Sequence, residues 1–166
     1  MKDAASADGP SKWAVAADAL TQLTGDFDGN LRFGLTLFPD TTAPACGQVD
    51  VAVPIGDATA GPIAALLAAA AGTDDANYPD GPCVTNIDSA MAQVAELPAL
   101  AEPTRPHYAM LVTDGKQAGC EVDGGDAGTE ATIAAMLAAG VRTYVVGFGD
   151  AVDAPQLARL DRKSVV

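Results

Sequence analysis

The chain has 166 residues, of which 49 % are hydrophobic and only 5 % aromatic, so one domain can bury a core made mainly of aliphatic side chains. Its formal net charge of −13 repels phosphate backbones, which argues against nucleic acid as a partner. No apolar run reaches the roughly 18–20 residues needed to cross a bilayer, and no signal peptide follows Met1.

The first half of the chain predicts two helices and a pair of strands. Apolar residues recur at helical spacing over 12–23, and Ser11 stands where an N-cap is expected. Residues 31–38 and 49–53 alternate between apolar and polar, so each predicts a strand, and their closeness suggests an antiparallel edge pair. A proline near its start and a glycine just past its end bound a helix over 62–71.

The second half predicts helices that alternate with buried strands. In order, these are a helix that Thr85 can cap and that reaches Leu97, a strand over 108–113, a helix over 130–139 capped by Thr129, a strand over 141–146 and a helix over 155–160. The strand over 108–113 is a near-continuous apolar run, which is typical of a parallel strand covered on both faces, and the strand over 141–146 is expected to be buried as well. Such alternation indicates βαβ units and an α/β fold with a mostly parallel sheet. We expect a single domain over 1–160 and a charged tail over 161–166.

Three cysteines, Cys46, Cys83 and Cys120, lie in loops rich in Gly, Pro and Asp. An odd number cannot form a closed disulfide framework, and the four-ligand spacing of a zinc site is absent. One disulfide with a free thiol and three buried thiols both remain open. Because buried thiols are less expected in such loops, the sequence favours one disulfide and an oxidising compartment.

Two oxygen donors are expected beyond the carboxyl ends of the strands, where parallel sheets carry their functional loops. Asp114 ends a buried strand and Gly115 follows it, which suits a carboxylate facing a hard cation but equally describes an Asp-Gly turn. The hydroxyl of Thr85, at a helix start, can bind a metal as a neutral donor. Thr85 and Asp88 also match a Thr-x-x-Asp capping box, which needs no metal.

The order of these elements resembles the von Willebrand factor A domain family over roughly residues 1–160. The order begins with an amphipathic helix. It is followed by a strand ending Phe-Pro, a helix opening Thr-Asn-Ile, a strand ending Thr-Asp-Gly and a strand Tyr-Val-Val-Gly-Phe-Gly. The resemblance implies a three-layer, Rossmann-like open sheet, mostly parallel with one antiparallel edge strand, and helices on both faces. It also implies a metal-ion-dependent adhesion site for Mg²⁺, or for Mn²⁺ or Ca²⁺, in which a Thr and an Asp of the family map onto Thr85 and Asp114.

The chain departs from the family pattern at both ends. The Asp-x-Ser-x-Ser motif, which supplies the other metal ligands in the family, does not occur. In bacterial members that motif often continues as Ser-Gly-Ser-Met, so we expect Met1 to be its last residue and the central first strand to be missing. We also expect the family's last strand and helix, which would follow residue 160, to be missing. We therefore expect an incomplete site that binds metal weakly or not at all.

The resemblance implies a non-catalytic, protein-binding module for adhesion or assembly, in which the cation captures an acidic residue of a protein partner. The parent protein would be bacterial and either secreted or anchored at the cell surface. One alternative is an intracellular subunit that acts with an ATPase partner, although cysteines in loops argue against that setting. Another is a nucleotide-binding α/β enzyme, which would need a glycine-rich turn after its first strand that this chain does not show.

Overall fold

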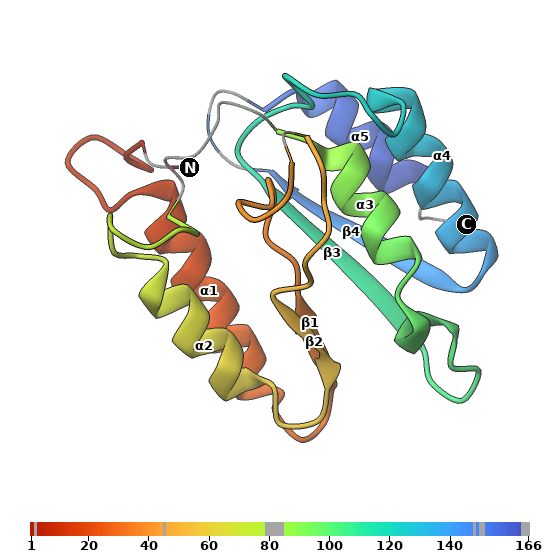
Figure 1. The fold of residues 1–166 in the computed structure, drawn as a ribbon, viewed down its shortest axis with the longest axis horizontal. Helices are drawn as coiled ribbons and strands as arrows, with labels where there is room; N and C mark the ends of the chain where they lie inside the picture. Colours follow the sequence, from red (N-terminus) through yellow and green to blue (C-terminus); the bar gives the residue numbers. More distant parts are fainter. Residues whose placement is uncertain (2, 45, 79–84, 148, 150–151, 164–166) are drawn as a thin grey trace. The chain divides into compact units, whose positions relative to one another are not determined.

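The computed structural model describes residues 1, 3–44, 46–78, 85–147, 149 and 152–163 (Figure 1). The chain divides into two compact units. Unit 1 comprises Met1–Leu37 and Asp50–Pro82, and unit 2 comprises Phe38–Val49 and Cys83–Val166. None of the helices in the described ranges is both long and apolar enough to cross a membrane.

Unit 1 consists of two helices and an antiparallel pair of strands. In chain order these are α1 (Lys12–Asp26), β1 (Phe33–Leu35), β2 (Val53–Gly56) and α2 (Ala60–Ala69). The predicted antiparallel pairing is confirmed, with Phe33 opposite Gly56 and Leu35 opposite Val53. The predicted cap of α1 is also confirmed, because the backbone N–H of Ala14 donates to Ser11 Oγ at 3.1 Å.

Both strands of unit 1 differ from their predicted ranges. β1 has only three residues, and its register with β2 shifts between Phe33 and Leu35. Residues 49–52 do not extend β2, and Val49, which belongs to unit 2, donates its backbone N–H to the carboxylate of Asp40 at 2.9 Å. The side chain of Val49 is correspondingly 73 % exposed.

The core of unit 1 is aliphatic. Ile63 and Leu67 of α2 are each only 1 % exposed and pack with Val53 and Ala17. Larger side chains close this core from α1 and β1, namely Trp13, Leu20, Phe33 and Leu35. In Figure 1, α1 and α2 lie side by side.

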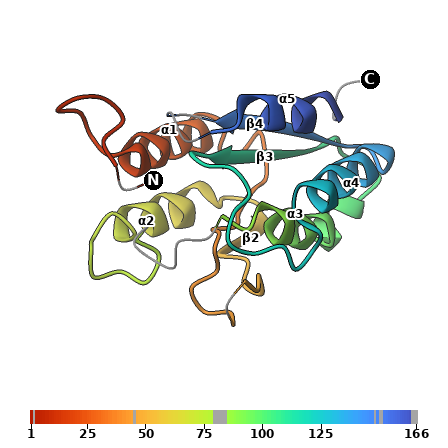
Figure 2. The ribbon, with the colours of Figure 1, turned by 90° about the horizontal axis from the view of Figure 1, so that it is seen from above.

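Unit 2 contains a parallel pair of strands with helices packed against it. In chain order its elements are α3 (Ile87–Ala95), the 3₁₀ helix η1 (Pro98–Ala101), β3 (His107–Thr113), α4 (Gly125–Ala138), β4 (Val141–Gly147) and α5 (Ala154–Lys163). β3 and β4 pair along their whole length, from His107 opposite Val141 to Thr113 opposite Gly147. Figures 1 and 2 show α3 and α4 side by side. The parallel pair, the antiparallel pair and the intervening helices agree with the predicted α/β fold.

The strands of unit 2 bury alternate side chains rather than all of them. Ala109 and Leu111 enter a core that also holds Ile87, Ile133 and Leu160. The prediction that these strands are covered on both faces is wrong for Tyr108, Met110, Tyr144 and Val146, which are 53, 50, 48 and 44 % exposed. The apolar run of β3 cannot reveal this difference, because its side chains on both faces are largely apolar, whereas in β4 the exposed Arg142 marks the face that it shares with Tyr144 and Val146.

Two helix starts in unit 2 also differ from prediction. α4 begins at Gly125, and Thr129 lies inside it with its hydroxyl donating to the Gly125 carbonyl at 3.0 Å. Thr129 is therefore not the N-cap. α3 begins at Ile87 and its N-cap is Asn86, whose side chain makes no capping hydrogen bond.

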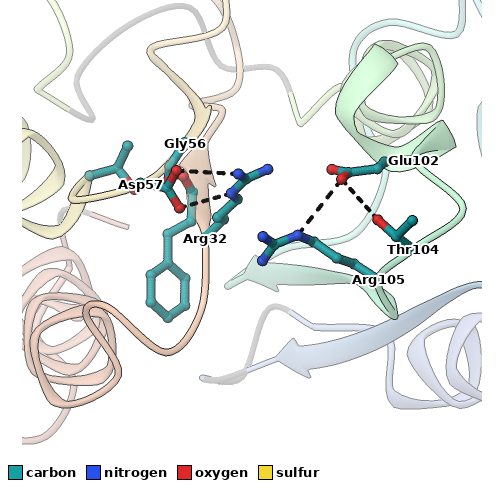
Figure 3. A network of polar contacts seen from close by, with 8 residues as sticks. Arg32, Gly56, Asp57, Glu102, Thr104 and Arg105 are labelled. Atoms are coloured by element: carbon teal, nitrogen blue, oxygen red, sulfur yellow. Dashed lines mark hydrogen bonds and ion pairs between the residues drawn. The ribbon is translucent and has the colours of Figure 1, made fainter.

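Charged side chains form ion pairs at the surface of each unit (Figure 3). In unit 1, Arg32 Nε lies 2.8 Å from Asp57 Oδ1, and Arg32 Nη2 lies 3.2 Å from Asp57 Oδ2, which is a two-point contact. In unit 2, Glu102 Oε1 accepts from Thr104 Oγ1 at 2.9 Å and lies 3.8 Å from Arg105 Nε. This second contact precedes β3, so it lies at the end of the strand away from Asp114.

Candidate functional site

The two predicted ligands belong to segments that lie against each other in unit 2. Thr85 precedes α3, and Asp114 follows the last residue of β3. Thr85 forms an antiparallel bridge with Ala118, in which the Thr85 N–H donates to the Ala118 carbonyl at 2.8 Å and the Ala118 N–H donates back at 3.1 Å. The chain entering α3 is therefore held beside the loop that starts at Asp114.

The hydroxyl of Thr85 faces the residue next to Asp114. A Cβ added to Gly115 would lie 3.5 Å from Thr85 Oγ1. The turn at Gly115 is fixed by the buried hydroxyl of Thr113, which donates to the Gly115 carbonyl at 2.9 Å and accepts from the Gly115 N–H at 3.2 Å. The structure thus brings Thr85 to the Asp114–Gly115 turn, as expected for loops at the carboxyl ends of a parallel sheet.

Asp88 does not form the capping box that its spacing from Thr85 suggested. Its carboxylate is fully buried and accepts from Gln117 Nε2 at 2.9 Å and from the backbone N–H groups of Asp123 and Gly125, each at 3.0 Å. These donors come from the loop after β3 and from the first residue of α4. The capping-box interpretation is wrong because the loop after β3 supplies the partners of this carboxylate.

A disulfide fixes the same loop to a second segment. Cys46 and Cys120 are bonded with their Cα atoms 5.4 Å apart, as the one-disulfide interpretation predicts. The carbonyl of Cys46 accepts from Ser89 Oγ at 3.3 Å, and the carbonyl of Cys120 accepts from Gln117 Nε2. Both halves of the bridge therefore bond to side chains at or beside the first turn of α3. Cys83 lies outside the described residues.

The Thr85 hydroxyl and the Asp114 carboxylate are of a kind that suits a hard cation, but two donors are fewer than such a cation coordinates. A carboxylate and a hydroxyl are the oxygen ligands that Mg²⁺ and Ca²⁺ prefer. Within the described ranges, no cluster of three or more His, Cys, Asp or Glu side chains is arranged to hold a metal. An ion held by Thr85 and Asp114 alone would need water to complete its coordination, and one carboxylate supplies little charge for tight binding.

Sequence reasoning did not predict the burial of three polar side chains at this edge. Asp88 and Asn86 are fully buried, and Gln117 is 8 % exposed. Neither amide atom of Asn86 has a hydrogen-bond partner in the described structure. No local sequence pattern pointed to the role of Asp88, because its partners at Asp123 and Gly125 lie 35 and 37 positions further along the chain.

A parallel strand pair whose following loop meets the start of a neighbouring helix is the arrangement of an α/β domain, in which functional loops lie at the carboxyl ends of the strands. The family model described as von Willebrand factor type A domain matches residues 3–164, so the chain belongs to this family. No curated protein and no solved structure matches the sequence significantly. Domains of this family are commonly protein-interaction modules, are generally not enzymes and typically bind a divalent metal.

Proposed function

We propose that this chain is a non-catalytic protein-binding module in which Thr85 and Asp114 hold a divalent cation. The cation would be Mg²⁺, or Mn²⁺ or Ca²⁺, and a carboxylate of a protein partner would complete its coordination. The observation that supports the proposal is the position of the Thr85 hydroxyl, which lies 3.5 Å from where a Cβ on Gly115, the residue after Asp114, would stand. Two hard oxygen donors from separate segments thereby share one loop edge.

The charge of the chain gives the cation a specific task. A formal net charge of −13 repels an acidic partner at long range. A divalent ion between Asp114 and the partner's carboxylate reverses the sign of that local interaction. Binding of an acidic partner should therefore require the cation, and the partner's carboxylate should in turn raise the affinity for the cation.

The first test measures Mn²⁺ binding to the purified chain. The readout is water-proton relaxation, and Mg²⁺ serves as the competitor. We expect weak, saturable binding that Asp114→Asn abolishes and Thr85→Val weakens. Asp18→Asn removes an exposed carboxylate of α1 in unit 1 and should leave the dissociation constant unchanged. Equal losses in Asp114→Asn and Asp18→Asn would show that Mn²⁺ responds only to net charge, and the proposal would then be wrong.

We also propose that the protein works outside the cell or at its surface. The support is the bond between Cys46 and Cys120, because disulfides persist in oxidising compartments. Trapping thiols in intact producing cells before lysis should leave Cys46 and Cys120 unlabelled. Labelling of both in the native protein would favour an intracellular role beside an ATPase partner instead.

A further inference from the structure

Two helices of unit 2 are capped by side chains from outside the helix. Gln117, in the loop after β3, accepts the N–H of Asp88 at 3.0 Å through its Oε1, so it caps the first turn of α3. Asp88 in turn accepts the N–H of Gly125, the first residue of α4. The N-cap position of α4 is Gly124, which has a φ of 92° and no side chain to do this. The two caps therefore interlock.

Burial makes this interlock specific. Asp88 is 0 % exposed, and a buried carboxylate is tolerated only when hydrogen-bond donors surround it. Gln117 Nε2, Asp123 N–H and Gly125 N–H are those donors, and the N-terminal ends of α3 and α4 favour negative charge there. A shift of residues 117–125, within the loop that follows β3, would break all of these bonds at once. The loop after β3 is thereby held in one position against α3.

The same loop sets the geometry of the proposed metal site. It starts at the Asp114–Gly115 turn, and it contains Ala118, the partner of Thr85 in the backbone bridge. We propose that Asp88 and Gln117 are positioning residues that fix the separation of Thr85 and Asp114 through this loop. The inference rests on the proposed function of that pair. It makes the affinity for the cation depend on a buried carboxylate that is not itself a ligand.

The experiment compares Asp88→Asn and Gln117→Met with Ile133→Val. Ile133 is also fully buried in unit 2 but belongs to its apolar core, so its variant controls for lost stability. Mn²⁺ binding and amide hydrogen exchange are measured at a temperature at which every variant is folded. If Asp88→Asn does not fold, Gln117→Met alone decides, because it removes the cap of α3 and keeps the carboxylate.

We expect both network variants to raise the Mn²⁺ dissociation constant about tenfold or more, as loss of supporting hydrogen bonds does in other metal sites. Ile133→Val should leave the dissociation constant unchanged. Exchange of the Thr85 and Ala118 amides should accelerate in the network variants only. Unchanged affinity for Mn²⁺ in both network variants would overturn the inference, even if both variants were less stable.

The two proposals can fail separately. If the unaltered chain does not bind Mn²⁺, the proposed function is wrong, and exchange at the Thr85–Ala118 bridge alone decides whether Asp88 and Gln117 position the loop. If the chain binds Mn²⁺ through Asp114 but the network variants bind it equally well, the proposed function stands and the positioning role is wrong.

Discussion

Units 1 and 2 differ in what they bury. Unit 1 closes around Ile63, Leu67 and Val53, and its buried Thr24 satisfies its hydroxyl on a carbonyl of its own helix. Unit 2 buries Asp88 and Gln117 beside an apolar core, and each depends on partners far along the chain. Apolar burial rewards contact of any orientation, whereas buried polar groups demand defined partners. The side-chain and backbone positions that depend on defined hydrogen bonds therefore lie in unit 2, at the loop after β3 and the segment that contains Thr85.

The largest effects should come from the apolar cores. Leu67→Ala in unit 1 and Ile133→Ala in unit 2 each remove a side chain that is at most 1 % exposed. Each should lower the free energy of unfolding by about 2–5 kcal/mol, because a cavity remains where the methyl groups were. Urea unfolding measures the loss. Val49→Ala, at a side chain that is 73 % exposed, should change little. A small effect of Ile133→Ala would show that unit 2 relies on its polar network more than on its core.

The disulfide should matter next. Cys46→Ser combined with Cys120→Ser opens a link between residues 74 positions apart. The free energy of unfolding should fall by about 2–4 kcal/mol, because the unfolded chain gains freedom that the bridge removes. Urea midpoints of this variant and of the unaltered chain give the difference. Cys83→Ser keeps the bridge and is the matched control. Equal midpoints for all three proteins would mean that the loop after β3 is held by Asp88 and Gln117 alone.

A smaller effect should follow from removing the cap of α1. Ser11→Ala deletes the acceptor of the Ala14 N–H and should cost about 1 kcal/mol. Because this cap is local, faster amide exchange should be confined to the first turn of α1. Ser11→Asp restores an acceptor and should recover most of the loss. Faster exchange throughout unit 1 would contradict the contrast with unit 2, where capping links separate segments.

This contrast also explains what could be predicted from the sequence. The helix after Ser11 and the two strand pairs depend on periodicity and on neighbours in the chain, so local patterns reveal them. The start of α4 was placed too late, because the acceptor for the Gly125 N–H is Asp88, which lies 37 positions earlier. No local pattern contains a cap that comes from another helix.

The candidate site was predictable to a similar degree. The rule that loops at the carboxyl ends of parallel strands share one edge placed Thr85 near Asp114, and in the structure the Thr85 hydroxyl lies 3.5 Å from where a Cβ on Gly115 would stand. Whether these donors hold a cation stays a prediction. The role of Asp88 was misjudged, because its spacing from Thr85 fits a capping box while its actual partners lie in the loop after β3.

The smallest effects should come from the surface ion pairs in Figure 3. Asp57→Asn removes a two-point contact with Arg32, whose side chain is 34 % exposed, while that of Asp57 is 78 % exposed. Water and salt screen such a pair, so the free energy of unfolding should fall by about 0.2–1 kcal/mol.

Glu102→Gln loosens a 3.8 Å contact with Arg105 in unit 2 and should lower the free energy of unfolding by less than Asp57→Asn does. Urea unfolding of both variants at low and high salt measures these effects. Salt should shrink the effect of Asp57→Asn, because it screens the ion pair that this substitution removes. A loss that salt does not change would show that unit 1 also depends on a defined polar contact, and the contrast between the two units would then be one of degree.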